Sequence, residues 1–87
     1  MSRPEITPEQ LERTMERVVT RLKSRIRQKG RGSFSSKHEI LGVITEEYNE
    51  LVEAVHGKES SVYEELMDLA VGSIFSLACI YYKTVDW

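Results

Sequence analysis

The 87-residue chain has a single cysteine, Cys79, so an internal disulfide framework is excluded and a reducing cytoplasm is the expected compartment. The first residues are polar and charged, so no secretory signal peptide is expected. The longest nearly uncharged run, residues 69–82, is shorter than the roughly 20 residues that span a bilayer. A membrane helix is therefore not expected, and residues 1–87 are predicted to form one small domain.

The lack of strand patterns and the scarcity of histidine further limit the possible fold and the possible metal sites. The sequence shows no alternating strand pattern and no internal repeat, which favours an all-α fold. Histidine is scarce, because the chain holds only His38 and His56. A di-iron helix bundle needs a Glu-x-x-His motif on two helices, whereas Glu53 and His56 form the only one here. A di-iron site is therefore disfavoured.

Three helices are predicted from start signals and from apolar residues at helical spacing. Each start combines Ser or Thr with Glu or Gln three residues later, as a capping box does: Thr7 to Gln10, Ser36 to Glu39, and Ser61 to Glu64. The predicted helices cover residues 8–28, 37–56 and 62–83. The first is basic. The second and third are joined by a short connection, about residues 57–60, so segment 36–83 is predicted to be an antiparallel helix pair.

The apolar surface of the third predicted helix indicates that the chain forms a homo-oligomer. From Leu66 onward it is apolar around most of its circumference, and a single neighbouring pair of helices cannot cover so much apolar surface. Burial against another copy of the chain is the economical solution. We therefore expect a three-helix subunit that assembles into a helical-bundle homo-oligomer, either a dimer or a tetramer.

Charge is unevenly distributed along the sequence. Residues 1–37 carry a net charge of +6, and residues 38–87 carry −8. The basic part could bind phosphate or nucleic acid, or it could neutralise the acidic part within the fold or an oligomer. Glutamates interrupt the arginines of the first helix, so a continuous nucleic-acid-binding stripe is not expected. Gly30 and Gly32 lie in a loop predicted to be a linker, because no phosphate-loop motif surrounds them.

The most informative feature is a set of four carboxylates. Asp68 lies where the third helix becomes apolar, and an ionised carboxylate is costly there unless a positive group meets it. Glu65 precedes it by three residues, and Glu47 and Glu50 have the same spacing on the second helix, so each pair shares a helical face. In an antiparallel pair the two faces would lie at similar heights. Oxygen ligands of this kind favour Mg²⁺ or Mn²⁺.

These residues carry a resemblance to a known family. Glu47-x-x-Glu50, a spacer of 14 residues and Glu65-x-x-Asp68 resemble the motifs of the MazG-type nucleoside triphosphate pyrophosphohydrolases, which are all-α oligomers. The resemblance covers roughly residues 36–82. It implies Mg²⁺-dependent hydrolysis of a nucleoside triphosphate to the monophosphate and pyrophosphate, as in nucleotide-pool house-cleaning. It also implies that Glu47, Glu50, Glu65 and Asp68 hold the metal ions and form the catalytic centre.

The chain departs from the family in its supply of phosphate-binding cations. Many members have a further helix with Lys or Arg residues, whereas Lys83 is the only late cation here. Substrate-binding charge is therefore expected from Lys83 and Lys37, with Lys29, Arg31 or a second subunit as other sources. The alternative function is a non-catalytic helical oligomer that acts as an interaction or nucleotide-binding protein.

Overall fold

The computed structural model describes residues 2–57 and 61–87 and contains three helices. These are α1 (Pro8–Lys29), α2 (Lys37–Val55) and α3 (Val62–Tyr81), and no strand occurs within the described ranges. The all-α prediction is confirmed, and each predicted helix end lies within two residues of the observed one. Most of the predicted connection between the second and third helices, residues 57–60, lies outside the described residues.

Only the first of the three predicted capping boxes is complete. At α1, the Thr7 hydroxyl accepts from the Gln10 backbone N–H, and the Gln10 side chain accepts from the Thr7 N–H. At α2 and α3 the serine accepts as predicted, but the glutamate three residues later does not return the bond. Glu39 instead accepts from the Ser35 N–H at 2.7 Å. The Glu64 carboxylate pairs with an arginine of α1, since a cation attracts it more strongly than a neutral amide does.

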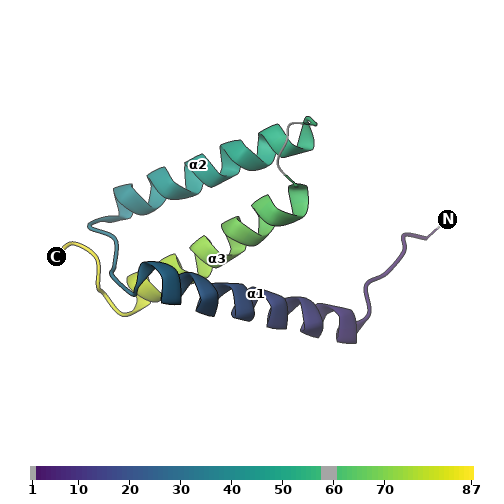
Figure 1. Cartoon of the computed structure of the whole chain (residues 1–87), viewed down its shortest axis with the longest axis horizontal. Helices are drawn as coiled ribbons and strands as arrows, with labels where there is room; N and C mark the ends of the chain where they lie inside the picture. The colour runs from purple at the N-terminus through teal and green to yellow at the C-terminus, as the bar shows by residue number, and fades with distance from the viewer. Residues whose placement is uncertain (1, 58–60) are drawn as a thin grey trace.

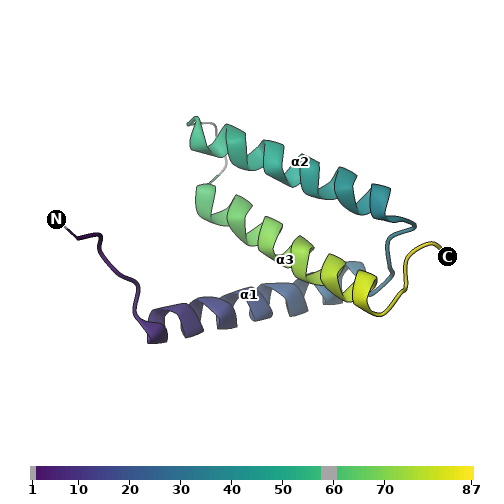
Figure 2. The same cartoon turned by 180° about the vertical axis from the view of Figure 1, so that it is seen from behind.

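Helix α3 lies between the other two helices and contacts both (Figures 1 and 2). Helix α2 lies alongside α3 and has the more extensive contact with it (Figure 1). Helix α1 packs against α3, and its N-terminal end extends beyond the rest of the molecule (Figure 1). In the part of the chain that the structure describes, no helix is long and apolar enough to cross a membrane.

The hydrophobic core is small. Its buried apolar members are Ala54, Met67, Val71 and Cys79, so the cysteine is buried as its apolar neighbours predict. The radius of gyration is 15.0 Å, against about 12 Å for a compact domain of this length. The accessible surface is 7276 Å², and a compact monomer of 10.1 kDa would expose only about 5,300 Å². The single chain thus exposes far more surface than its size requires.

Much of this surface is apolar and follows the helices in stripes. On α3, Leu77 is 68% exposed and Leu66 is 49% exposed. Helix α2 exposes Leu41, Tyr48, Val52 and Val55 at intervals of three, four or seven residues. Of the apolar stripe of α1, Leu11, Met15 and Val19 remain exposed. Three helix faces therefore lack an apolar partner within the described chain.

Candidate metal centre and adjoining cavity

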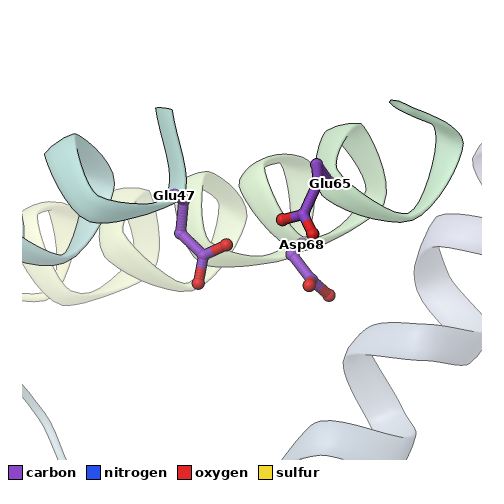
Figure 3. Close-up of side chains that lie close together, drawn as sticks. All are labelled: Glu47, Glu65 and Asp68. Atoms are coloured by element: carbon purple, nitrogen blue, oxygen red, sulfur yellow. The ribbon is translucent and has the colours of Figure 1, made fainter. Parts of the chain in front are cut away.

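Three of the predicted carboxylates converge where α2 faces α3. Glu47 projects from α2, and Glu65 and Asp68 project from α3 (Figure 3). One carboxylate oxygen from each of the three lies within 4.8 Å of the others. The i, i+3 spacing on α3 places Glu65 and Asp68 on one face. The packing of α2 against α3 supplies the third group.

The oxygens of this cluster are short of partners. Glu65 is buried, with only 8% of its surface exposed, and its Oε2 atom has no hydrogen-bond partner among the described residues. The Oε2 atom of Glu47 is likewise buried and unpaired within that part of the chain. Buried polar atoms are nearly always satisfied, and an anionic oxygen is especially costly to leave alone. A divalent cation held by carboxylate oxygens would satisfy both atoms, so the donor set fits Mg²⁺ or Mn²⁺.

The surroundings of the cluster raise the pKa values of two glutamates on α2. Burial, followed by the neighbouring Asp68 and Glu65 carboxylates, raises the pKa of Glu47 above 4.5, while Arg25 opposes the shift. A side-chain hydrogen bond with Glu65 raises the pKa of Glu50 above 4.5, and the charge of Glu47 adds to this effect. Both shifts favour the neutral acid, which is the result expected when carboxylates share a site without a metal.

The fourth predicted ligand, Glu50, lies at the edge of this group. Its side chain is exposed, and its oxygens do not belong to the set that meets within 4.8 Å. The influence of Glu65 on the pKa of Glu50 indicates that the two carboxyl groups lie near each other. Glu50 thus lies outside the inner group that Glu47, Glu65 and Asp68 form.

Asp68 has positive partners that the sequence did not reveal. Arg25 Nη2 donates to Asp68 Oδ1 at 2.5 Å, and Arg21 Nη1 lies 3.6 Å from the same oxygen. Arg21 also pairs with Glu64 at 2.9 Å. The four-residue spacing of Arg21 and Arg25 on one face of α1 was visible in the sequence, but which acids they meet depends on how α1 crosses α3. These pairs confirm that part of the basic segment neutralises acids within the fold.

A cavity of about 300 Å³ opens beside the cluster. Glu47 and Asp68 line it at the carboxylate side, and Arg25 and Lys29 of α1 line it as cations. Gly72 also lines it, and a Cβ added there would meet only Ile44 Cδ1, at 3.7 Å. The glycine thus leaves space beside the carboxylates rather than permitting a close helix contact. The cavity combines hard anionic ligands with cations, as a metal–phosphate site requires.

Aromatic rings form another wall of this cavity. Phe34, from the loop between α1 and α2, meets Phe75 of α3 edge to face, with ring centroids 5.9 Å apart. The C-terminal segment is hydrogen-bonded to that loop. The Asp86 N–H donates to the Ser35 carbonyl at 2.7 Å, and the Trp87 indole N–H donates to the Phe34 carbonyl at 3.2 Å. Neither phenylalanine stood out in the sequence, because nothing local shows that the loop folds over α3.

The predicted substrate-binding lysines lie elsewhere. Lys37 is the first residue of α2, and Lys83 follows the end of α3; both are exposed. Neither belongs to the described lining of the cavity, and Arg31 is also absent from it, whereas Lys29 is present. Gly30 and Gly32 of the predicted linker line the same cavity.

No family model, curated protein or solved structure gives a significant match to this chain.

Proposed function

We propose that this protein is an Mg²⁺-dependent nucleoside triphosphate pyrophosphohydrolase of the MazG type. The observation that carries the proposal is the convergence of Glu47, Glu65 and Asp68, with two buried carboxylate oxygens that lack hydrogen-bond partners among the described residues. The reaction itself comes from the resemblance of Glu47-x-x-Glu50 and Glu65-x-x-Asp68 to that family's motif. Hydrolysis of non-canonical nucleotides is the corresponding cellular role.

Each carboxylate has a distinct part in this proposal. Glu65 and Glu47 offer buried oxygens to the metal, Asp68 offers a carboxylate that lines the cavity, and Glu50 completes the set from the exposed side. A bound Mg²⁺ supplies an activated water and offsets the charge on the phosphoryl oxygens. Phe34 and Phe75, which line the same cavity, give the nucleobase an apolar surface.

The proposed assembly is a homo-oligomer in which α2 and α3 form an antiparallel pair and α3 contributes most of the interface. The occupant of the exposed apolar stripes is a second copy of the chain. The surface excess over a compact monomer is roughly 2,000 Å² per chain, about twice what each partner buries in a standard protein–protein interface, so covering it takes an interface of the large, obligate class or more than one interface. A dimer or tetramer would therefore remove the excess exposure of Leu66 and Leu77.

Product analysis tests the proposed reaction. The purified chain is incubated with a panel of canonical and modified nucleoside triphosphates, with Mg²⁺ or with EDTA, and the products are separated by ion chromatography. The proposal predicts equal amounts of nucleoside monophosphate and pyrophosphate, and only with Mg²⁺. Release of orthophosphate and a diphosphate, or no hydrolysis of any nucleotide, would contradict it.

A second candidate function is a non-catalytic helical oligomer that binds nucleotides or another protein. The ion pair between Arg25 and Asp68 favours it, because a resident cation already neutralises part of the cluster. The two candidates differ in one outcome: the second predicts nucleotide binding or assembly without pyrophosphate release.

A further inference from the structure

Arg25 lies where the carboxylate cluster meets the cavity. Its guanidinium is held by Asp68 Oδ1, and both residues line the cavity. Lys29, one helical turn further along α1, lines the same cavity. The two cations thus share one face of α1 and border one space with the candidate metal ligands.

The position of Arg25 creates a competition. Asp68 accepts the arginine hydrogen bond through Oδ1, and the same carboxylate supplies one of the oxygens that could hold a metal ion. A divalent cation at that group would repel the guanidinium and compete for the same carboxylate charge. Arg25 would then need another anion. Arginine binds phosphate with two parallel hydrogen bonds, so the phosphates of a nucleotide are its natural second partner.

We propose that Arg25 exchanges partners: it neutralises Asp68 in the metal-free protein, and it binds nucleotide phosphate, together with Lys29, once a divalent cation binds the carboxylates. This inference rests on the proposed function for the identity of the ligand. It assigns the phosphate-binding cations to α1, in place of the late Lys or Arg residues that the resembled family uses. Neither Lys37 nor Lys83 is needed for this role, which agrees with their position outside the described lining of the cavity.

The exchange couples the two ligands. Metal binding must displace Arg25 from Asp68, and a phosphate group offsets that cost by accepting the displaced guanidinium. Nucleotide should therefore tighten metal binding, and metal should tighten nucleotide binding by the same factor. Arg21 is not expected to behave in this way, because its shorter ion pair is with Glu64 and the residue does not line this cavity.

The first experiment measures the affinity for Mn²⁺ in the absence of nucleotide, by titration calorimetry or electron paramagnetic resonance. The proteins are the wild type, Arg25→Gln, Arg25→Lys and the control Arg27→Gln, which removes an exposed charge of α1 outside the cavity lining. Arg25→Gln should bind Mn²⁺ about two- to fivefold more tightly than the wild type, because the competing cation is gone. Arg27→Gln should change this affinity less. Equal or weaker Mn²⁺ binding by Arg25→Gln than by Arg27→Gln would overturn the proposal.

The second experiment measures the affinity for non-hydrolysable α,β-methylene nucleoside triphosphates at saturating Mn²⁺. Arg25→Gln should lose roughly tenfold or more in affinity, as expected for a lost charge-assisted hydrogen bond to phosphate. Arg25→Lys should retain Mn²⁺ affinity near that of the wild type and lose only part of the nucleotide affinity, because it keeps the charge without the planar fork. Thermal melts establish that each variant is folded. Unchanged nucleotide affinity in Arg25→Gln would refute the partner exchange.

These outcomes separate the inference from the proposed function. If the wild type shows the predicted Mn²⁺ and analogue binding but releases no pyrophosphate, the proposed function fails and the partner exchange stands. If the wild type hydrolyses nucleotides and Arg25→Gln binds the analogue as tightly as the wild type, the inference alone fails.

Discussion

Arg25 and Asp68 join α1 to the carboxylate cluster through one hydrogen-bonded ion pair, with Nη2 2.5 Å from Oδ1. The pair makes Asp68 different from the other members of the cluster. Asp68 has cations beside it, whereas the buried Oε2 atoms of Glu47 and Glu65 have no partner among the described residues. The same three carboxylates therefore differ in what each contributes to metal-free stability.

Neutralising Asp68 and neutralising Glu65 should have opposite effects on the metal-free protein. Asp68→Asn removes partly exposed ion pairs between α1 and α3, so we expect a loss of about 0.5–1 kcal/mol in unfolding free energy. Glu65→Gln replaces a carboxyl group whose buried Oε2 atom has no hydrogen-bond partner among the described residues by an amide that can donate to its neighbours, so we expect a gain of about 1 kcal/mol. Urea unfolding in EDTA measures both. Stabilisation by Asp68→Asn together with destabilisation by Glu65→Gln would contradict the described electrostatics.

The raised pKa of Glu47 predicts a specific pH dependence. Because the folded protein holds this proton more tightly than the unfolded chain, the contribution of Glu47 to stability falls as pH rises from 4.5 through the raised folded pKa. The Glu47→Gln variant has no ionisable group at this position and therefore does not lose this contribution as pH rises. The unfolding free energy of Glu47→Gln minus that of the wild type should therefore grow with pH in EDTA and then level off.

Saturating Mg²⁺ provides the control for that measurement, because the metal favours the ionised carboxylates. With the metal present, the growing advantage of Glu47→Gln should disappear and the wild type should become the more stable protein. A difference between the two proteins that does not vary with pH in EDTA would contradict the assigned pKa direction.

The C-terminal segment should support the cavity wall. Removing residues 84–87 breaks the bonds to Ser33, Phe34 and Ser35, so we expect a stability loss of about 1–2 kcal/mol, because these hydrogen bonds are largely exposed. Faster hydrogen exchange should be confined to the loop between α1 and α2, and nucleotide analogues should bind more weakly. Trp87→Phe, which removes only the indole donor, should have a smaller effect. If the truncated protein binds the analogues as tightly as the wild type, the loop between α1 and α2 does not contribute to the nucleotide site.

The exposed face of α3 should determine assembly. Sedimentation velocity at micromolar concentration should show a dimer or tetramer, and Leu77→Lys should shift it toward the monomer, because a charge cannot be buried cheaply in an apolar interface. The control Gln28→Lys, at an exposed polar position of α1, should leave the oligomeric state unchanged. A monomeric wild type would contradict the proposed oligomer.

Local patterns predicted the helices well because start signals and apolar spacing act within a few turns. The i, i+3 spacing of Glu65 and Asp68 likewise predicted a shared face, and the computed structure brings Glu47 to the same place. Contacts between distant segments were not predictable. The pairing of Arg25 with Asp68 and the approach of Phe34 to Phe75 depend on how α1 crosses α3 and on where the loop folds. The diversion of Glu64 from its predicted capping box to Arg21 has the same long-range cause.

The central claim is tested most directly by Mg²⁺-dependent pyrophosphate release, measured side by side for the wild type, Asp68→Asn and the control Glu53→Gln. Glu53 is an exposed acid on α2 outside the carboxylate cluster, so its variant should match the wild type. The proposed function predicts pyrophosphate and monophosphate from at least one nucleotide with the wild type, and none with Asp68→Asn, because a neutral amide is a poor ligand for a hard cation. Full activity of Asp68→Asn, or no pyrophosphate from the wild type with any nucleotide, would contradict it.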